Sequence, residues 1–276
     1  MRIDQLLVQR GLASTRSQAQ RLIGDGVEWM QADSWRRIVK NGDEVPQGAR
    51  VRLLNDSEAR YVSRGGLKLE AALKQTGLSV AGSACLDVGQ STGGFTDCLL
   101  KSGAASVVGV DVGSAQLHPS LRNDPRVRCI EGVNARTLVA SDLIATSAYP
   151  ESDGGGISLK LPGEDGADLQ TPQAPAFDLA VIDVSFISQT LMLPSIVALL
   201  KPGGVVLSLV KPQFELQPGQ VGKGGIVRDA ASYLIVEKRL RDACADAGLT
   251  VHAWFDSPIA GGDGNREFFI HASKPV

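Results

Sequence analysis

The fold of this chain of 276 residues is decided by residues 85–95, Cys85-Leu86-Asp87-Val88-Gly89-Gln90-Ser91-Thr92-Gly93-Gly94-Phe95. The first four of these residues end an apolar run of strand length, and the glycines that follow let the backbone approach a ligand closely. A helix that starts at Gly93 would offer free N–H groups to the same ligand. The stretch therefore predicts the first strand, turn and helix of a ligand-binding α/β sheet.

Short β-rich runs alternate with helical runs through most of the chain. The expected strands cover residues 84–88, 106–110, 127–130, 179–182, 205–210, 250–255 and 268–272. The expected helices cover residues 65–76, a segment from 93, a short segment after 110, a segment from 187, and 231–247. Alternation of this length predicts a doubly wound, Rossmann-like α/β sheet.

The first 58 residues follow another pattern. Two short amphipathic helices are expected first, with Ser14 as the cap of the second, and a strand-like stretch runs on to Leu54. The apolar residues of that stretch are Val27, Val39, Val45, Val51 and Leu53. We therefore expect a small α+β domain at 1–58, a polar linker at 59–64 and a larger domain at 65–276.

Residues 145–176 interrupt the alternation with three consecutive glycines, four prolines and several acidic residues. This composition predicts a flexible surface loop.

Charge is unevenly distributed along the chain. Residues 1–74 hold 13 Lys and Arg against 9 Asp and Glu, whereas residues 75–276 hold 15 against 21. The front is therefore the expected anion-binding part. No apolar run approaches the ~18 residues of a membrane span, and the start lacks a signal-peptide pattern, so a cytoplasmic protein without membrane contact is expected. Four scattered cysteines and three histidines indicate neither a metal site nor disulfides.

The glycine spacing indicates the kind of ligand. It is Gly-x-x-x-Gly-Gly and not Gly-x-Gly-x-x-Gly, which disfavours a dinucleotide enzyme. Asp111 ends the second expected strand, where a carboxylate can accept hydrogen bonds from both ribose hydroxyls of an adenosine-containing ligand. S-adenosylmethionine fits this pattern better than a dinucleotide.

Four polar residues, Lys68, Asp183, Lys211 and Glu267, lie at or near the ends of expected elements. Asp183 follows an apolar strand at the edge where open α/β sheets bind ligands, although it could also cap the next helix. Lys211 follows an equally apolar strand, where a lysine is costly unless it is exposed or paired. A second cation or partial burial leaves some neutral amine to act as a base, so this cluster could activate a hydroxyl without a metal.

Several motifs resemble the TlyA family, historically called haemolysin A. They are Ser-Arg-Gly-Gly-Leu-Lys-Leu-Glu at 63–70, Asp-Val-Gly at 87–89 with Ser-Thr-Gly-Gly-Phe-Thr-Asp at 91–97, Ile-Asp-Val-Ser-Phe-Ile-Ser at 182–188, Leu-Val-Lys-Pro-Gln-Phe-Glu at 209–215, Gly-Lys-Gly-Gly-Ile-Val-Arg-Asp at 222–229, Ser-Pro-Ile at 257–259 and Gly-Asn-Arg-Glu-Phe at 264–268. The resemblance covers nearly the whole chain. It implies a mostly parallel, FtsJ-like methyltransferase sheet with an antiparallel last strand, preceded by an RNA-binding module of the type first seen in ribosomal protein S-four.

The resemblance also implies an activity: transfer of a methyl group from S-adenosylmethionine to ribose 2′-hydroxyls of ribosomal RNA in ribosomal subunits, with no obligate protein partner. The catalytic tetrad maps to Lys68, Asp183, Lys211 and Glu267, with Lys211 as the base. The implied cofactor residues are Gly89, Ser91, Gly93, Gly94, Phe95, Asp111 and Asn134. The candidate RNA-binding residues are Arg10, Arg16, Arg21, Arg37, Lys40, Arg64, Lys223 and Arg228. Gln90 departs from the small residue usual at its position.

Two other functions compete with this interpretation. One is an RNA-binding protein whose methyltransferase fold has lost its activity, and the intact tetrad argues against it. The other is a pore-forming cytolysin, suggested only by the historical family name. A cytolysin would need an amphipathic insertion segment, and none is found in the sequence.

Overall fold

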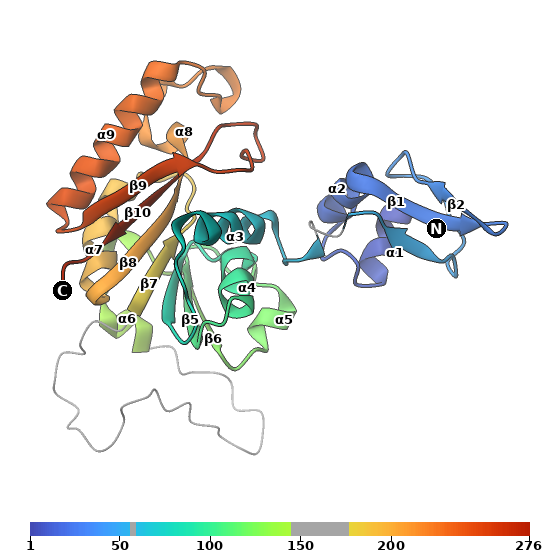
Figure 1. The fold of residues 1–276 in the computed structure, drawn as a ribbon, viewed down its shortest axis with the longest axis horizontal. Helices are drawn as coiled ribbons and strands as arrows, with labels where there is room; N and C mark the ends of the chain where they lie inside the picture. The colour runs from blue at the N-terminus through green and yellow to red at the C-terminus, as the bar shows by residue number, and fades with distance from the viewer. Residues whose placement is uncertain (56–58, 145–176) are drawn as a thin grey trace.

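The computed structural model describes residues 1–55, 59–144 and 177–276, and within them it contains two sheets (Figure 1). The N-terminal sheet is three-stranded with the order β2-β1-β3. Its elements are α1 (Ile3–Gln9), α2 (Arg16–Gly26), β1 (Val27–Gln31), β2 (Ser34–Arg37) and β3 (Val51–Leu53). The two helices pack on this sheet through an apolar core of their own, which includes Leu6, Leu22 and Val27.

Two expectations for this region were wrong in detail. Thr15, not Ser14, caps α2, because its side chain accepts a hydrogen bond from the N–H of Gln18. Val39 and Val45 lie outside the strands. The carboxylate of Asp43 accepts hydrogen bonds from the N–H groups of Val39 and Lys40, which forms a turn after β2 and leaves Val39 80% exposed.

The large sheet has seven strands in the order β6-β5-β4-β7-β8-β10-β9. These are β4 (Ala84–Val88), β5 (Ser106–Asp111), β6 (Val127–Glu131), β7 (Phe177–Ile182), β8 (Leu200–Val210), β9 (Thr250–Asp256) and β10 (Phe268–Ser273). Strands β4 to β8 pair in parallel, whereas β10 pairs antiparallel with both β8 and β9. This confirms the predicted mostly parallel sheet with an antiparallel last strand.

Helices cover both faces of the large sheet (Figure 1). Those after the N-terminal unit are α3 (Arg64–Thr76), α4 (Gly94–Lys101), α5 (Pro119–Arg122), α6 (Ala140–Ile144), α7 (Leu193–Ala198), α8 (Pro212–Glu215) and α9 (Ala230–Asp246), with short 3₁₀ turns at η2 (Ala135–Thr137), η3 (Gln189–Leu191), η4 (Pro218–Gln220) and η5 (Lys223–Gly225). Successive side chains of β7 point to opposite faces of the large sheet. Leu179 and Val181 pack with α3 and α4, whereas Ala180 and Ile182 pack with α7 and α9.

Two elements of the large sheet differ from expectation. Strand β8 starts five residues before the expected 205, and the helix expected from Ile187 is divided into η3 and α7, with Pro194 in the first turn of α7. The loop expected at 145–176 lies outside the described residues. Among the residues that are described, no helix combines the length and apolar character needed to span a bilayer.

The segment that leads into α3 packs closely on the large sheet's helices. Tyr61 is buried among residues of α3 and α4, its carbonyl accepts a hydrogen bond from Gln18 of α2, and the N–H of Val62 donates to Asp97 of α4. A Cβ on Gly66 would lie 2.3 Å from Cγ of Tyr61, whereas a Cβ on Gly65 would meet nothing nearer than 3.4 Å. The chain therefore needs glycine at Gly66 for space, and Gly65 offers a matched control.

We expect Gly66→Ala to destabilise the protein by about 1–3 kcal/mol, because the added methyl displaces the buried Tyr61 ring. This corresponds to a fall in melting temperature of roughly 2–4 °C per kcal/mol. Gly65→Ala should leave the melting temperature unchanged or raise it through better helix propensity. Thermal unfolding followed by circular dichroism measures both melting temperatures. Equal values for the two variants would show that the Tyr61 ring can move aside without loss of stability.

Candidate functional site

The glycine-rich turn after β4 is shaped by the elements packed around it. Gly89 has φ +84°, and a Cβ there would lie 2.4 Å from the carbonyl oxygen of Asp183. Gly93 has φ +91°, and a Cβ there would lie 2.4 Å from the Leu121 side chain. Both conformations are ones that favour glycine. The turn therefore passes close under the end of β7, where Asp183 lies.

The next two predicted cofactor residues are also fixed by packing. A Cβ on Gly94 would lie 2.1 Å from Oγ of Ser63, just before α3. Phe95 is buried and stacks on Phe269 of β10, with ring centroids 6.5 Å apart. The structure thus places Gly94 and Phe95 under the turn, where they hold its shape.

Gln90, the residue that departs from the family pattern, fits because β5 leaves room for it. Its amide occupies the space that a Cβ on Gly109 would need, and its Nε2 donates to Thr96 Oγ1 at 2.9 Å. The Thr96 hydroxyl donates in turn to Asp87 Oδ2 at 2.6 Å. Complete burial of Asp87 raises its pKa to about 7.

Asp111 lies at the end of β5 beside this turn. Its two carboxylate oxygens accept hydrogen bonds from the N–H groups of Ser91 at 2.8 Å and Gly113 at 2.7 Å. The next residue, Val112, is 78% exposed and gives the site an apolar surface. Asn134 is exposed after β6, and its Oδ1 accepts from the N–H of Arg136 at the start of η2.

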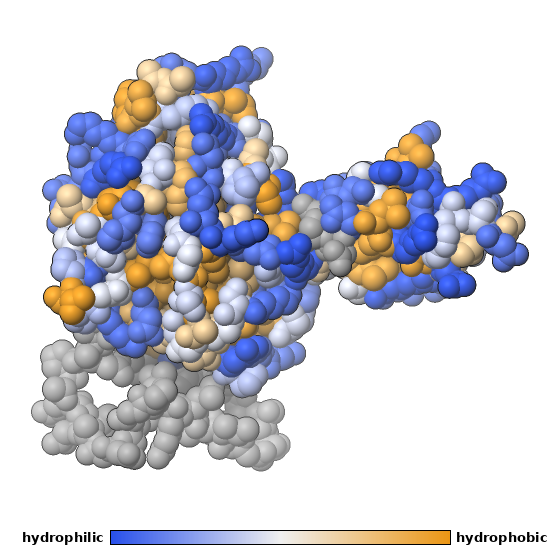
Figure 2. All heavy atoms as spheres, viewed as in Figure 1, coloured by the Kyte–Doolittle hydropathy of each residue, from blue (hydrophilic) through white to orange (hydrophobic). Residues whose placement is uncertain are grey.

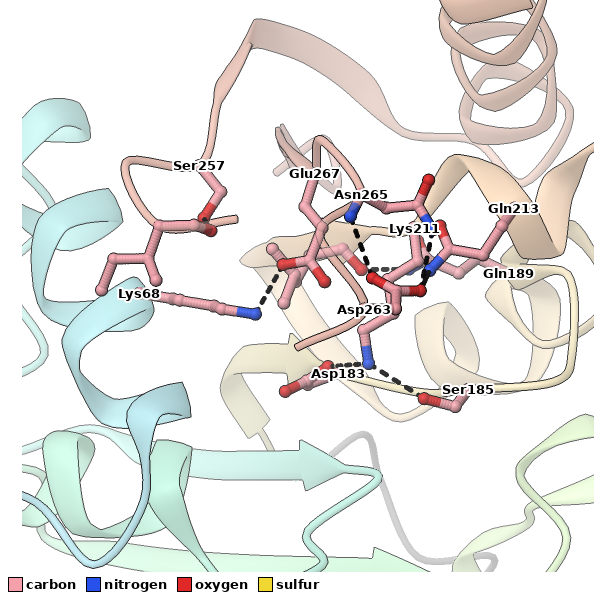
Figure 3. Close-up of polar contacts among 12 residues, drawn as sticks. Lys68, Asp183, Ser185, Gln189, Lys211, Gln213, Ser257, Asp263, Asn265 and Glu267 are labelled. Atoms are coloured by element: carbon pink, nitrogen blue, oxygen red, sulfur yellow. Dashed lines mark hydrogen bonds and ion pairs between the residues drawn. The ribbon is translucent and has the colours of Figure 1, made fainter. Parts of the chain in front are cut away.

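The four candidate catalytic residues converge as two ion pairs (Figure 3). Lys68 Nζ, from the second turn of α3, lies 2.5 Å from Glu267 Oε2, just before β10. Lys211 Nζ, at the end of β8, lies 2.6 Å from Asp183 Oδ1 at the end of β7. The structure therefore brings together side chains from four elements that are far apart in the sequence.

The two pairs differ in burial. Glu267 is 3% exposed, and its burial raises its pKa, while Lys68, the nearer cation, and Lys211 oppose that rise. Lys211 and Asp183 are half-buried and remain open on one side. Two cations and two carboxylates thus stabilise one another in a site that is only partly solvated. Among the described residues, no cluster of three metal-ligating side chains occurs.

Two functional candidates that the sequence did not single out follow Asp183 directly. Ser185 Oγ accepts a hydrogen bond from Lys211 Nζ at 3.0 Å. Phe186 has φ +66°, is 90% exposed and contacts Phe214 with ring centroids 5.0 Å apart. A bulky residue in the left-handed region is uncommon and often marks a functional position. The only sequence signal for it is a large apolar residue next to a strand end.

Asn265 connects the Glu267 segment to the glycine-rich loop at 222–229. The buried Nδ2 donates to the Gly225 carbonyl at 2.8 Å and to Asp263 Oδ2 at 2.7 Å, and Oδ1 accepts from the N–H of Val227 at 2.9 Å. Asp263 also accepts from Gln213, two residues after Lys211 (Figure 3). One amide side chain therefore fixes the base of a loop whose Lys223 and Arg228 are exposed.

The candidate RNA-binding residues in the N-terminal unit and at the start of α3 fall into three groups. Arg10 donates to the carbonyls of Ala49 and Gln47 at 2.6 Å each, and Arg16 forms an ion pair with buried Asp4 at 3.0 Å, so both contribute to the structure of this unit. Arg37, the last residue of β2, and Lys40, in the turn that follows, are exposed. Arg21, beside α2's buried face, and Arg64, the first residue of α3, are half-buried.

Hydrophilic residues cover most of the visible face of this unit, with a few apolar groups between them (Figure 2). Further basic residues that the sequence did not single out are Arg36 and Arg52 in the small sheet and Arg50 just before β3. Arg52 lies 4.2 Å above the Trp35 ring and pairs with Glu28.

Comparison with known proteins gives a consistent result. The profile of the FtsJ-like methyltransferase family matches residues 61–274, and that of the S4 domain matches residues 1–26. The chain is 40% identical to the 16S/23S rRNA (cytidine-2′-O)-methyltransferase TlyA of Mycobacterium tuberculosis, over 98% of this chain and 88% of that protein. It is 36% identical to Hemolysin A of Brachyspira hyodysenteriae, over 98% of this chain and 99% of that protein.

A solved structure named for a hemolysin of Streptococcus thermophilus is 38% identical to this chain. It superposes with a TM-score of 0.68, and the match covers 100% of this chain and 88% of that one.

The buried Lys68–Glu267 pair can be tested by a double-mutant cycle. Lys68→Met leaves Glu267 buried without its cation, and Glu267→Gln leaves Lys68 without its anion, so each change alone should destabilise the protein strongly. The double variant should lose about 1–3 kcal/mol less of its free energy of unfolding than the two single variants lose in sum. Urea unfolding measures the three variants, with Lys74→Met at the exposed end of α3 as the control. Additive effects would show that the pair contributes no coupling energy.

Proposed function

The chain belongs to the TlyA family of FtsJ-like methyltransferases, and we propose that it transfers a methyl group from S-adenosylmethionine to a ribose 2′-hydroxyl of ribosomal RNA. The observation that carries this proposal is the meeting of the two ion pairs beside the glycine-rich turn. The turn suits a nucleoside cofactor, and the ion pairs suit a hydroxyl that must lose its proton. Such a substrate would place the activity in the cytoplasm, where ribosomes are assembled.

The residues around the turn fit S-adenosylmethionine, whose sulfonium supplies an electrophilic methyl group. Each oxygen of Asp111 accepts one backbone hydrogen bond and keeps a lone pair, so the carboxylate can also accept from two neighbouring ribose hydroxyls. Val112 offers apolar surface to the adenine, with Asn134 beside it. The backbone at Gly89 and Ser91 would line the amino acid end of the cofactor, and Gly93, Gly94 and Phe95 would hold the turn in shape.

In its neutral amine form, Lys211 is the residue best placed to take the proton of the 2′-hydroxyl. The hydroxyl oxygen would lose this proton as it bonds to the methyl carbon, and the bond between that carbon and the sulfonium sulfur would break. Asp183 and Ser185 hold the Lys211 amine in one position, and the carboxylate of Asp183 would stabilise the ammonium that results. Lys68 and Glu267 form the opposite wall and would orient the hydroxyl for in-line attack.

Phe186 is suited to hold the base of the modified nucleotide. A ribose inside a folded RNA reaches a recessed site only when its nucleotide leaves the stack, and an unstacked base is stabilised by an aromatic ring. Phe186 presents an exposed ring three residues from Asp183. The exposed Lys223 and Arg228 on the loop fixed by Asn265 would contact phosphates on the same side of the site.

The N-terminal unit would capture structured RNA. Its S4 match, its excess of basic residues and the exposed Arg37 and Lys40 support a phosphate-binding role. Residues 1–58 would then bind the RNA, and residues 65–276 would carry out the reaction. Contacts of this kind predict that binding weakens as salt concentration rises.

The decisive experiment measures methyl transfer from radiolabelled S-adenosylmethionine to ribosomal subunits that lack the modification. Alkaline hydrolysis should then leave label in linkages protected by a 2′-O-methyl group. Lys211→Ala should lower the rate by at least about 10²-fold, because the proton acceptor is lost, with RNA affinity nearly unchanged. Lys201→Ala, at the other end of β8, is the matched control and should keep wild-type turnover.

Two outcomes would contradict this proposal. Wild-type turnover by Lys211→Ala would remove Lys211 from catalysis. Cofactor binding without labelled RNA of any kind would favour an RNA-binding protein with an inactive methyltransferase fold.

We also expect Phe186→Ala to lower kcat/KM for ribosomal subunits by about 5- to 100-fold, since stacking on an aromatic ring contributes ~1–3 kcal/mol per base. The affinity for S-adenosylmethionine alone should not change, because the proposed partner of the Phe186 ring is the substrate base and not the cofactor. Phe186→Tyr retains the ring and should keep most of the activity. Steady-state methylation and calorimetric cofactor binding measure the two effects, and a loss of cofactor affinity would place Phe186 in the cofactor site instead.

A further inference from the structure

We infer that Glu215 and Gln189, which lie behind the proposed active site and touch neither ion pair, are positioning residues that hold the Asp183 and Lys211 segments at a fixed separation. This inference rests on the proposed function. It concerns a buried polar network whose groups take no part in the chemistry described above.

The large sheet alone does not fix the separation of the Asp183 and Lys211 segments. Strands β7 and β8 are parallel neighbours with Ile182 opposite Ser208, so their hydrogen-bonded ladder fixes the spacing of the two chains up to these residues. Beyond them the segments 183–188 and 211–216 leave the ladder. Lys211 then connects the two segments on the open side, through Asp183 and Ser185.

Glu215 connects the same two segments on the buried side. It is 2% exposed, and its carboxylate accepts hydrogen bonds from Ser188 Oγ at 2.5 Å and from the N–H of Gln189 at 2.8 Å. The Arg239 guanidinium of α9 donates to the Glu215 carbonyl oxygen. The end of the Lys211 segment is therefore tied to the end of the Asp183 segment and to a helix on the face of the sheet.

Gln189 extends this link back to β8. Its Nε2 donates to the carbonyl of Leu209 at 2.6 Å, and its Oε1 accepts from Ser208 Oγ at 2.6 Å. Both ends of the Gln189 amide thus bind the strand that leads into Lys211. Together the two side chains join both segments through four hydrogen bonds, three of them buried, near the point where the β7–β8 ladder stops.

A buried carboxylate among apolar residues is a costly way to fill space, because burial disfavours its charged form and raises its pKa. Apolar residues of similar volume would pack without that cost. The network instead serves geometry, since it joins the segment that carries Asp183 and Phe186 to the segment that carries Lys211. A shift of about 1 Å at such a site can lower the rate by 10²-fold.

The test compares three variants. Glu215→Gln retains both hydrogen bonds, since its Oε1 accepts from Gln189 and its Nε2 donates to Ser188 Oγ, and it should keep kcat within about threefold. Methionine at position 215 has a similar volume, but Glu215→Met loses both hydrogen bonds. Its kcat should fall by about 10- to 100-fold, whereas the KM for ribosomal subunits and the affinity for the cofactor should be nearly unchanged. Glu237→Met, which removes a carboxylate from an ion pair on α9, is the control.

Hydrogen exchange provides a readout that does not depend on activity. Amides of 183–189 and 211–216 should exchange faster in Glu215→Met than in Glu215→Gln or Glu237→Met. Glu215→Met could instead have a lower melting temperature but an unchanged kcat, measured at a temperature where the variant is folded. That result would show that Glu215 has only a structural role and would overturn the inference. Unchanged exchange would overturn it as well. If the wild-type protein methylates no RNA, the proposed function fails, and the exchange result still decides whether Glu215 fixes the two segments.

Discussion

The parallel pairing of β7 with β8 is the constraint on which the site depends. Parallel neighbours end at the same edge of a sheet, so Asp183 and Lys211 emerge side by side although 28 positions separate them in the chain. The neighbouring pairing of β4 with β7 brings the glycine-rich turn to the same edge. Gly89 allows the final approach, because any side chain there would strike the Asp183 carbonyl. The position of the glycine-rich turn and that of the Asp183–Lys211 pair are thus consequences of one strand order.

The Lys68–Glu267 ion pair depends on the antiparallel strand β10 and on helix α3. Glu267 precedes β10, which runs antiparallel to β8, so the start of β10 lies at the edge where β8 ends. Lys68 reaches that edge from α3, on the face of the sheet. Their contact encloses the site on its buried side and fixes α3 at its N-terminal half. The cost of burying two charges is tolerable here because each has its partner within 2.5 Å.

Much of this could be predicted from the sequence, and the successes share a physical cause. The strands are apolar runs bounded by glycine, and Asp183 and Lys211 stand out as charges at their ends. Lys68 and Glu267 also lie near the ends of expected elements, but neither follows an apolar strand, and their pairing with each other depends on tertiary structure. Phe186 was missed because a positive φ leaves no trace in composition. Glu215 and Gln189 were missed because hydrogen bonds between segments about 26 residues apart depend on tertiary structure. Val39 was misassigned because the Asp43 side chain forms a turn after β2, and Val45 because its N–H pairs with the Met1 carbonyl outside a regular strand.

The segment before α3 connects the N-terminal unit to the chemistry through packing. Its Tyr61 carbonyl is held by Gln18 of α2, its Ser63 hydroxyl lies against Gly94 under the cofactor turn, and four residues beyond Arg64 the same helix presents Lys68 to Glu267. A displacement of α2 would therefore act on a short, closely packed path that ends at the turn and at Lys68. Gly66 has no room for a methyl group beside Tyr61, so this path has little freedom to absorb a displacement. Close packing of this kind transmits small shifts, and here it joins the unit proposed to bind RNA to the residues proposed to orient its hydroxyl.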